Sequence, residues 1–534
     1  MKKVFFLLML TLFATVMVAC GKDDEKDLDY SFSLNVDNVS ELRESISIDV
    51  TLTDTKNELE NSEVRGKITE AGKKDAISDK KVTFTEKELT KEVNFTKLTA
   101  NTEYVVVFYA SYSGTTVELA KLNVKTSSQG TEEVPYEIDS YDDFANIVKK
   151  DRSAYFKLVK DIDFNGKSIS PMFTSSTAFT GNFDGNGKVI KNFKVSDVDS
   201  EGNPTPIKTS TQNYGLFGYI SATGKVYNVT LDTFTINVHY TSTSKTGNFG
   251  LLAGYCAGTI ENVTVVNSTL SVKGTAKTQG YLVVGGLVGN LAAKGKVSNV
   301  NVAADINVNG PIDAVVGGVV ATTVNSELIT EEGAKVANVS KANYSGDIKV
   351  EISGTNSYDA NIVAGGVVGR NYTSVIDEVS SEGTISVTAT YTTVADYSIL
   401  VGGLVGWNIS HSGVVSNSTS SLVFDITTYD VPTEENKNVT VYGGLLVGRN
   451  GGGSPSYAEV KNCTYTSTEE NKINVIGNEA VIVKTGVVAH EVSTGNVIGC
   501  TANTNSQILV QNYQFDAETK APVADGEANR ITFN

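Results

Sequence analysis

The chain has 534 residues, a formal net charge of −17 at pH 7 and only four cysteines. A chain of this length is too large for one compact hydrophobic core, so it holds several domains or one elongated domain. The negative charge argues against nucleic acid and against an anionic membrane surface as partners. The few cysteines form neither a disulfide framework nor a zinc-binding pattern, so we expect no metal and no cofactor.

The first twenty residues have the form of a bacterial export signal. Lys2 and Lys3 precede an apolar run that ends at Ala19 and is too short to span a membrane. Cys20 follows directly, and this junction resembles the lipobox of bacterial lipoproteins, in which the cysteine is acylated and becomes the mature N-terminus. The resemblance implies an extracytoplasmic protein, lipid-anchored to the cell membrane or outer membrane and exposed at the surface. The alternative is a plain signal peptide in which Cys20 is incidental.

Residues 30–127 alternate apolar and polar side chains with the period of β-strands. The segment around Tyr104 resembles the part of fibronectin type III domains that carries the corner tyrosine. The core tryptophan usual in those domains is missing, because the only tryptophan of the chain is Trp407. We expect a fibronectin- or immunoglobulin-like antiparallel β-sandwich. Its clearest strands are 31–36, 45–50, 82–84, 104–109 and 122–124.

Residues 137–205 are expected to form the cap and the entry coils of a repeat domain. Ser140 begins a variant of the helix-capping pattern, and Phe144, Ile147 and Val148 follow at helical spacing. A short amphipathic helix here would cover the unpaired strands of the first coil.

Within 206–515 a short apolar run bracketed by glycines recurs eight times, at intervals of 32 to 48 residues. A typical copy is Gly-Gly-Leu-Val-Gly at 285–289. Each repeat continues with a segment of the form Val-x-Asn-Val and an alternating apolar pair, which gives three strand-like pieces. A repeat of this length cannot bury its apolar face alone and must stack on its neighbours. The sequence therefore predicts an all-β chain whose main part is a parallel β-helix with three strands per coil, right-handed by the rule for parallel crossovers.

The glycine-bracketed runs resemble the GLUG motif of bacterial surface and secreted proteins, and the resemblance extends over more than half of the chain. Together with the patterns above, it predicts seven segments. They are a signal peptide (1–19), an acidic tether (20–29), the sandwich (30–127), a linker (128–136), the cap and entry coils (137–205), the β-helix (206–515) and a C-terminal cap (516–534), where 513–515 and 531–533 could pair as a hairpin.

Stacked coils turn equivalent sequence positions into columns. The asparagines of the Val-x-Asn-Val segments form one column, and their amides can hydrogen-bond to each other, so we expect a structural ladder. These asparagines are Asn228, Asn262, Asn299, Asn338, Asn417 and Asn462. The residue after each glycine-bracketed run forms a second column, whose later members are Arg370, Trp407, Arg449 and His490. Planar and cationic groups in a row could bind a sugar; the alternative is a set of strand-end residues without a ligand.

No catalytic motif is found. His490 and Glu491 begin like the zinc-protease signature, but Thr494 replaces the second histidine. GLUG runs also accompany an immunoglobulin-cleaving metalloprotease family, whose catalytic motif is absent from this sequence. The three histidines fall in separate repeats, with no nucleophile motif around them.

These observations predict a monomeric, non-catalytic surface lipoprotein that acts as an adhesin or binds glycans or host matrix proteins. Its contact with the membrane would be the lipid anchor alone, and nucleic acid is not expected as a partner. Two alternatives stay open: a carbohydrate-active β-helix enzyme, either a polysaccharide lyase or a glycosidase, and a purely structural surface component. Cys463 and Cys500 follow the ladder position in consecutive repeats, which predicts a buried, mostly reduced pair, with a disulfide as the alternative.

Overall fold

The computed structural model describes residues 31–56, 59, 64–85, 89–112, 114–169, 172–198, 204–275, 281–311, 313–323, 338–354, 360–391, 397–409, 413–430, 439–452, 458–477, 481–489, 496–515 and 522–533. The predicted signal peptide, Cys20, the acidic tether and His490 lie outside these ranges. The chain divides into two units, Met1–Tyr136 and Glu137–Asn534, and both consist mainly of β-strands. None of the helices in the described ranges is long and apolar enough to cross a lipid bilayer.

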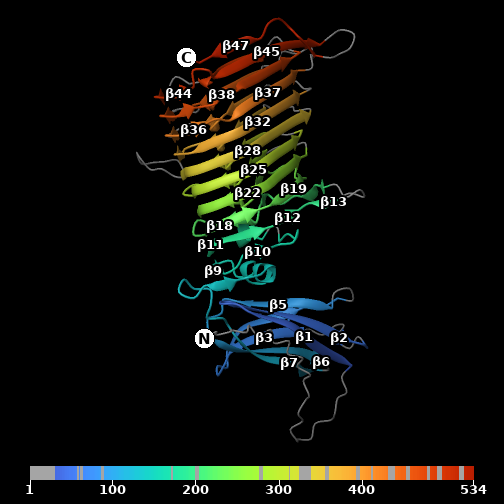
Figure 1. Ribbon diagram of the computed structural model, residues 1–534. Helices are drawn as coiled ribbons and strands as arrows, with labels where there is room; N and C mark the ends of the chain where they lie inside the picture. The colour runs from blue at the N-terminus through green and yellow to red at the C-terminus, as the bar shows by residue number, and fades with distance from the viewer. Residues whose placement is uncertain are drawn as a thin grey trace, which may run out of the picture. The chain divides into compact units, whose positions relative to one another are not determined.

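The N-terminal unit is an antiparallel β-sandwich, as its alternation predicts (Figure 1). Alternate side chains of its strands, such as Ile46, Ile48 and Val50, are completely buried in one core. The Tyr104 hydroxyl accepts a hydrogen bond from the Thr99 backbone N–H at 2.8 Å, which is the arrangement of a corner tyrosine. One sheet contains β1 (Phe32–Glu41), β2 (Ser45–Asp54) and β5 (Thr90–Thr96), and the other contains β4 (Ala76–Val82), β3 (Val64–Glu70), β6 (Glu103–Tyr112) and β7 (Thr115–Lys125).

The second unit opens with the predicted helix, which consists of α1 (Tyr141–Asp143) and the π-turn η1 (Phe144–Val148). The Ser140 hydroxyl accepts a hydrogen bond from the Asp143 backbone N–H at 3.1 Å and so caps the helix. Phe144 and Val148 are fully buried, and they close the apolar end of the first coils. The Phe144 ring centroid lies within 6.4 Å of the ring centroids of Phe164, Phe183 and Phe217.

The strand β8 (Tyr136–Ile138) precedes this helix, and most elements between the helix and the first complete coil are short. They are η2 (Ser175–Thr177) and the strands β9 (Tyr155–Leu158), β10 (Ile162–Asp163), β11 (Asn182–Lys191), β12 (Lys194–Val195), β13 (Asp197–Val198), β14 (Pro204–Thr205) and β15 (Ile207–Thr209).

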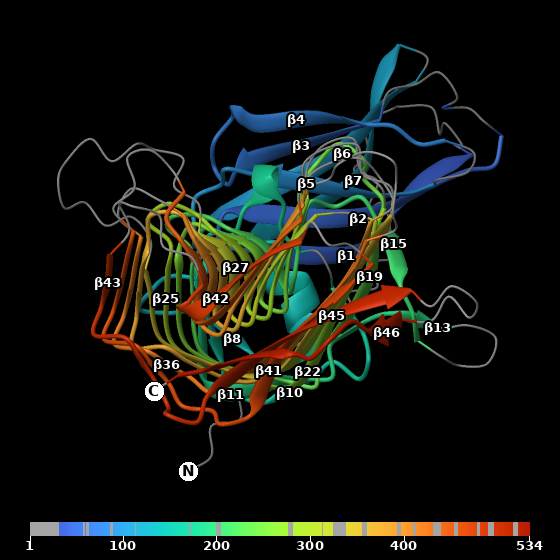
Figure 2. The same cartoon turned by 90° about the horizontal axis from the view of Figure 1, so that it is seen from above.

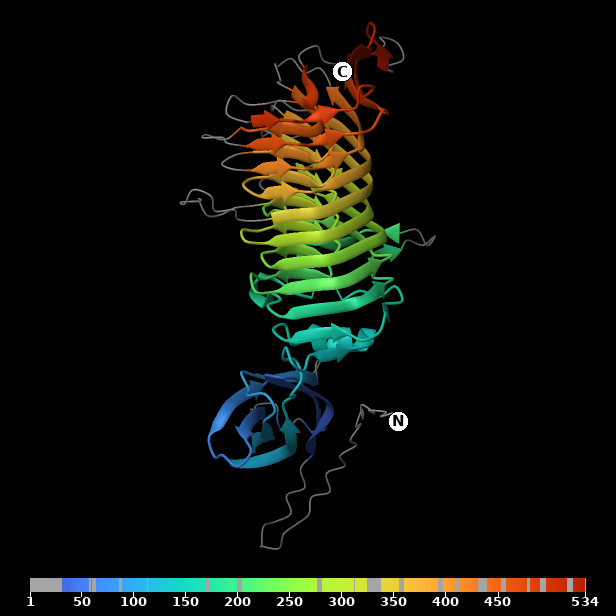
Figure 3. The same cartoon turned by 60° about the vertical axis from the view of Figure 1, so that its left-hand side comes forward.

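The repeats form a parallel β-helix, and Figure 3 shows its coils stacked one above another. One sheet carries the glycine-bracketed runs. Its strands before the bend in each run are β16 (Asn213–Tyr214), β20 (Gly247–Gly250), β23 (Leu282–Gly285), β26 (Ala314–Gly317), β29 (Ala360–Gly365), β33 (Tyr397–Gly402) and β42 (Val481–Val488). Those after the bend are β17 (Phe217–Ile220), β21 (Ala253–Cys256), β24 (Val288–Leu291), β27 (Val320–Thr323), β30 (Val368–Asn371) and β34 (Val405–Asn408), whereas β38 (Val439–Asn450) and β42 continue through both positions.

The second large sheet carries the Val-x-Asn-Val segments and the alternating apolar pairs. Its repeat strands are β18 (Lys225–Asp232), β19 (Thr235–Tyr240), β22 (Thr259–Gly274), β25 (Lys296–Gly310), β28 (Asn338–Gly354), β31 (Val375–Asp377), β32 (Ser380–Tyr391), β35 (Val414–Ser416), β36 (Thr419–Ser420), β37 (Val423–Asp430), β39 (Glu459–Lys461), β40 (Thr464–Tyr465), β41 (Glu470–Ile476), β43 (Asn496–Ile498), β44 (Thr501–Ala502) and β45 (Gln507–Phe515). Seen from above in Figure 2, the strands of successive coils follow one another, so equivalent positions form columns.

The coil of β23, β24 and β25 contains three strands, as predicted, but their limits differ from the prediction. In later coils the second sheet's part of the coil divides into two or three strands. The glycine-bracketed run is not a single strand, because it bends at Gly286 and Leu287 between β23 and β24. The two later pieces are joined in the single long strand β25. Glycine is required at the bend because a Cβ on Gly285 would lie 2.0 Å from the Val288 carbonyl oxygen. Leu287 turns inward and is fully buried.

The asparagine ladder occupies a corner of the coil at which the backbone is left-handed. Asn262 Nδ2 donates to Asn228 Oδ1 at 3.0 Å, and Asn462 Nδ2 donates to Asn417 Oδ1 at 3.3 Å. Asparagine tolerates left-handed backbone better than most residues, so one side chain serves both the corner and the ladder. The φ angles lie between +49° and +56° at Asn228, Asn262, Asn299, Asn417 and Asn462.

Asn338 does not belong to this ladder, so its assignment from the sequence was wrong. Asn338 pairs with Lys296, three residues before the ladder position. The residue at the corner is Lys341, with a φ of +50°, and Glu378 follows it in the next coil with a φ of +52°. Lys341 Nζ lies 3.8 Å from Glu378 Oε2, so in these two coils an ion pair replaces the amide contact.

The C-terminal hairpin also pairs differently from the prediction. β45 pairs antiparallel with β46 (Pro522–Ala524) and with β47 (Asn529–Thr532). Tyr513 therefore faces Ala524, and Ile531 faces Ile508 rather than the 513–515 segment. The sequence did not indicate β46 because it is three residues long and begins with a proline, which cannot donate a backbone hydrogen bond.

We expect Asn262→Ala to lower the free energy of unfolding by about 2–3 kcal/mol. Alanine pays about 1–2 kcal/mol for the left-handed backbone, and the lost amide hydrogen bond adds about 1 kcal/mol. Asn262→Gly is the matched control, because glycine accepts this φ and loses only the amide contacts. Urea unfolding followed by circular dichroism measures both variants. Equal midpoints for the alanine and glycine variants would exclude the backbone as the reason for asparagine at this corner.

Candidate functional site

The residues after the glycine-bracketed runs lie in one column of paired strands. Arg370 on β30 pairs with Trp407 on β34, and Trp407 pairs with Arg449 on β38. Thr322 on β27 precedes Arg370, and Asn290 on β24 precedes Thr322. We call these five residues the polar column. The earlier positions hold Tyr219 and Tyr255, whose rings stack with centroids 4.4 Å apart.

Cations and aromatic rings alternate along the later part of the polar column. The guanidinium carbons of Arg370 and Arg449 lie 5.4 Å and 5.0 Å from the Trp407 ring centroid. Because the two arginines belong to the coils on either side of Trp407, they cover opposite faces of the indole. Each cation–π contact stabilises by about 0.5–2 kcal/mol, depending on desolvation. Arg370 also lies over Tyr281, Arg449 over Tyr442, and Lys484 over Tyr442.

This stack changes what Trp407 can do. A sugar ring would bind tryptophan through an indole face, and both faces are already covered by guanidinium groups. The indole N–H is also engaged, because Nε1 donates to the Gly451 carbonyl oxygen at 2.8 Å. Trp407 therefore holds the two arginines apart and in place, and a ligand has to be recognised by the arginines and not by the indole face.

An apolar layer supports the stack. Val283, Val315, Val363, Leu400 and Tyr442 form a buried cluster, with Tyr281 and Trp407 packed against it. This packing fixes the rings and draws Arg370 inward, where its side chain is only 8% exposed. Trp407 and Arg449 are partly exposed.

Four of the five residues in the polar column have a buried polar atom without a hydrogen-bond partner. The atoms are Asn290 Oδ1, Thr322 Oγ1, Arg370 Nε and Arg449 Nε. A buried polar group without a partner costs about 1–3 kcal/mol, so such groups are rare and indicate a missing ligand or water. Within the described part of the chain, neither arginine forms an ion pair. Four such atoms in consecutive or neighbouring coils make this column the candidate site.

A second, fully buried amide ladder lies beside the polar column, and the sequence analysis missed it. Asn371, Asn408 and Asn450 directly follow Arg370, Trp407 and Arg449 in the sequence. Asn371 Nδ2 donates to Asn408 Oδ1 at 2.9 Å, and Asn408 Nδ2 donates to Asn450 Oδ1 at 2.8 Å. The recurrence of asparagine after the column residue in three consecutive repeats was the available sequence signal. This ladder fixes the strand ends from which the two arginines and the tryptophan project.

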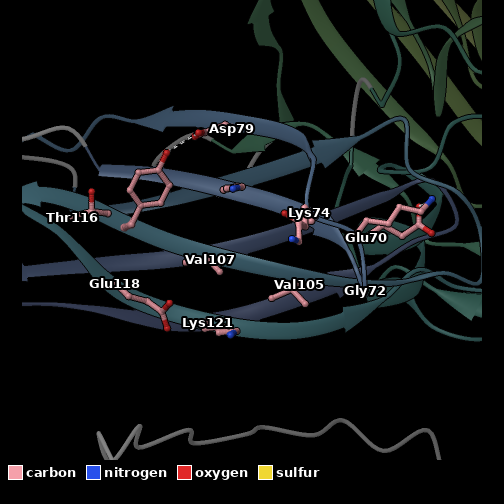
Figure 4. A pocket seen from close by; sticks show the side chains of 13 residues that line it. Glu70, Gly72, Lys74, Asp79, Val105, Val107, Thr116, Glu118 and Lys121 are labelled. Atoms are coloured by element: carbon pink, nitrogen blue, oxygen red, sulfur yellow. Dashed lines mark hydrogen bonds and ion pairs between the residues drawn. The ribbon is translucent and has the colours of Figure 1, made fainter. Parts of the chain in front are cut away.

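One pocket lies elsewhere, on the β4–β3–β6–β7 sheet of the sandwich, and has a volume of about 620 Å³ (Figure 4). Asp79 accepts hydrogen bonds from the Tyr109 hydroxyl at 2.6 Å and from Arg65 Nε at 2.9 Å. Burial raises the pKa of Asp79, but these two hydrogen bonds outweigh it and leave the pKa below its usual value. None of the lining residues has a buried polar atom without a partner, so this hollow lacks the unpartnered buried groups of the polar column.

The other residues considered as metal ligands or catalytic groups do not form a site among the described residues. No group of three or more histidine, cysteine, aspartate or glutamate residues that could hold a metal ion occurs among the described residues. In the entry coils Asp163 Oδ1 accepts hydrogen bonds from Asn192 Nδ2 and the Asn165 backbone N–H, both at 2.8 Å. These contacts lower the pKa of Asp163 and make it a turn residue. His239 is in an early coil, and His411 lies outside the described residues.

Cys463 and Cys500 are neighbours in the last two coils, and both thiols are free. Cys463 is fully buried, as predicted, but the prediction of a buried pair was wrong for Cys500, which is partly exposed because it lies in the last coil. The neighbouring Cys463 thiol lowers the pKa of Cys500 below the ordinary cysteine value, against the opposing effect of burial. Cys500 is therefore the more reactive thiol of the pair.

The comparisons with known proteins identify no family. No family model matches the chain. Among curated proteins the chain is similar to halomucin of Haloquadratum walsbyi, with 31% identity over 179 residues. The match spans 30% of this chain and 2% of halomucin. A function for this chain therefore has to come from the geometry of its own surface.

We expect alkylation of Cys500 by iodoacetamide to rise with pH and to level off at a lower pH than for an ordinary cysteine thiol. The reagent attacks the thiolate, and the thiol hydrogen bond from Cys463 increases the thiolate fraction near neutrality. Cys463→Ala removes the donor, so the midpoint should move toward the ordinary cysteine value of about 8.5. Cys463→Ser keeps a hydroxyl donor, so its midpoint should stay below that of the alanine variant. Mass spectrometry of the labelled peptides gives the rate at each site. A midpoint that is the same in all three proteins would show that the thiol pair is not coupled.

Proposed function

We propose that the chain is a surface-displayed, non-catalytic binding protein for glycans or host matrix proteins. The observation that carries the proposal is the row of unpartnered polar atoms on Asn290, Thr322, Arg370 and Arg449. A regular β-helix repeats its coil along one axis, so such a row offers an extended ligand one contact per coil.

The composition of the polar column favours binding over cleavage. Its residues are an amide, a hydroxyl, an indole and two guanidinium groups, and it contains no carboxylate. Glycoside hydrolysis commonly requires a pair of carboxyl groups, one of which acts as a proton donor. The polar column can hold a ligand but has no group with which to protonate a glycosidic oxygen.

The N-terminal sequence supports display at the cell surface. The junction of Ala19 and Cys20 supplies the acylation site, and the charged segment after it supplies a flexible spacer. The sandwich of residues 31–125 adds a folded spacer ahead of the β-helix. In this proposal the fatty acyl groups are the only contact with the membrane.

We expect Cys20→Ala to abolish acylation and to move the protein out of the membrane fraction. Stable attachment needs two or more acyl chains, which a lipoprotein receives at this one cysteine. Cys500→Ser is the matched control, because it removes a partly exposed thiol far along the chain. Labelling of cells with a fatty-acid analogue, followed by fractionation, distinguishes the variants. Labelled Cys20→Ala protein, or unlabelled wild-type protein, would contradict the anchor.

The binding role predicts that cells displaying the full chain adhere to immobilised glycans or matrix proteins more strongly than cells lacking it. Arrays of both ligand classes measure adhesion, and analysis of the supernatant measures released products. Adhesion without product release supports a binding protein. Shortened glycan products would assign an enzyme, and absence of adhesion to either class would contradict the proposed role.

A further inference from the structure

We propose that the polar column binds an anionic glycan, whose carboxylate or sulfate groups accept hydrogen bonds from Arg370 and Arg449. The inference rests on the proposed binding role and names the ligand class of the same site. It follows from the orientation of the guanidinium groups, their spacing, the neighbouring neutral groups and the charge of the chain.

Contact with Trp407 leaves the Nε donors of both arginines without a partner, while Arg370 Nη1 donates to the Tyr372 hydroxyl at 3.4 Å. The guanidinium carbons of Arg370 and Arg449 lie over the Trp407 ring, 5.4 Å and 5.0 Å from its centroid. The N–H bonds of a guanidinium lie in its plane, so face stacking does not satisfy them. Arg370 Nε and Arg449 Nε have no hydrogen-bond partner, and Arg370 is 8% exposed. A planar oxyanion at the guanidinium edge would supply the partner with the bidentate geometry that arginine prefers.

The two arginines are separated by one intervening coil, which holds Trp407. Two coil steps correspond to about 10 Å along the stack. This separation suits a polymer that carries one acidic group on every second sugar, and it is too long for both arginines to bind a single carboxylate. Lys484, which lies 5.6 Å from the Tyr442 ring centroid, adds a third cation beyond Arg449.

The earlier part of the polar column requires hydrogen-bond donors from the ligand. Asn290 Oδ1 is an acceptor, so an anionic oxygen cannot satisfy it. Thr322 Oγ1 can donate or accept, and its side chain is 1% exposed. A ligand with both oxyanions and hydroxyl groups satisfies all four atoms. An acidic polysaccharide has both, which favours it over a simple anion and over a neutral glycan.

Because the chain as a whole is negatively charged, a polyanion is expected to bind at this cationic site and not elsewhere on the surface. The chain carries a net charge of −17, so its average field repels a polyanion. Attachment of a polyanion therefore requires local cations that are not neutralised by the protein. Arg530, by comparison, is paired with Glu470 at 2.8 Å and offers no such charge.

Trp407 provides a direct probe, because it is the only tryptophan in the chain and contacts both arginines. The full-length protein in detergent is titrated with a sulfated polysaccharide (heparin), a uronate polymer (polygalacturonate), neutral dextran and polyglutamate. We expect saturable changes in tryptophan emission with heparin or polygalacturonate and none with dextran. The two acidic polymers distinguish sulfate from carboxylate as the recognised group.

Substitutions then locate the binding. The double variant Arg370→Gln/Arg449→Gln should weaken binding of the acidic polymer about a hundredfold, since each charged hydrogen-bonding group contributes roughly a factor of ten or more. Arg449→Lys keeps the charge but loses the planar fork, so it should weaken binding about tenfold. Arg530→Gln removes the same charge from an existing ion pair and should leave binding unchanged. Protection of Arg370 and Arg449 of the unmodified protein from phenylglyoxal by the bound polymer provides a readout that does not depend on variant folding.

Loss of binding in the arginine variants, with Arg530→Gln unaffected, supports the inference, as does protection of the two arginines. Equal binding of dextran, unchanged binding by the double variant, or equal binding of polyglutamate overturns it. Adhesion of displaying cells to a neutral glycan or matrix protein, without acidic-polymer binding, would overturn this inference and leave the proposed binding role standing. No binding in either experiment would overturn both.

Discussion

The shape of the repeat unit depends on one contact. At each glycine bend, the two strands that flank the bend approach each other closely. At Gly285, Gly317 and Gly365 a Cβ would lie 2.0–2.1 Å from a carbonyl oxygen four residues or fewer away. Any side chain there would open the bend, so the two strand columns could no longer stack side by side. With the bend preserved, the chain returns to the same place in every coil, and its backbone hydrogen bonds are satisfied by the coils above and below. Each side chain then lies next to the side chains at the equivalent positions of the adjacent coils.

In this arrangement a column favours side chains that interact well with an identical side chain in the adjacent coil. Asparagine does, because an amide both donates and accepts, and the chain uses it in an exposed ladder at Asn228 and Asn262 and in a buried one at Asn371 and Asn408. Arginine does not, since guanidinium groups in adjacent coils would repel each other about 5 Å apart. Trp407 between Arg370 and Arg449 separates the charges and contacts both. The same repetition therefore explains a structural ladder and a potential binding surface.

The repeat pattern was enough to predict the β-helix, because period and apolar spacing are set by the coil itself. The exceptions lie where a residue other than the usual one fills a column. Lys341 occupies a ladder corner, and the sequence offered Asn338 three residues earlier as a plausible substitute. The site was predicted only in part. Alignment of the repeats with one another placed Arg370, Trp407 and Arg449 in one column. It could not show that both indole faces are covered, since that depends on the direction of the side chains.

The two ends of the coil stack differ in how well they are covered, because the rings packed around Phe144 cover the N-terminal end. In a solenoid each coil is stabilised mainly by its neighbours, so local opening is easiest where a neighbour is missing. Among the described strands, β42 pairs with β38 alone, and Ile482 on it is half exposed. Local unfolding should therefore occur most readily at this end and become less frequent toward the end covered by Phe144. Arg449 lies on the strand next to this less stable end, whereas Asn290 has coils on both sides, so the two ends of the polar column differ in local stability.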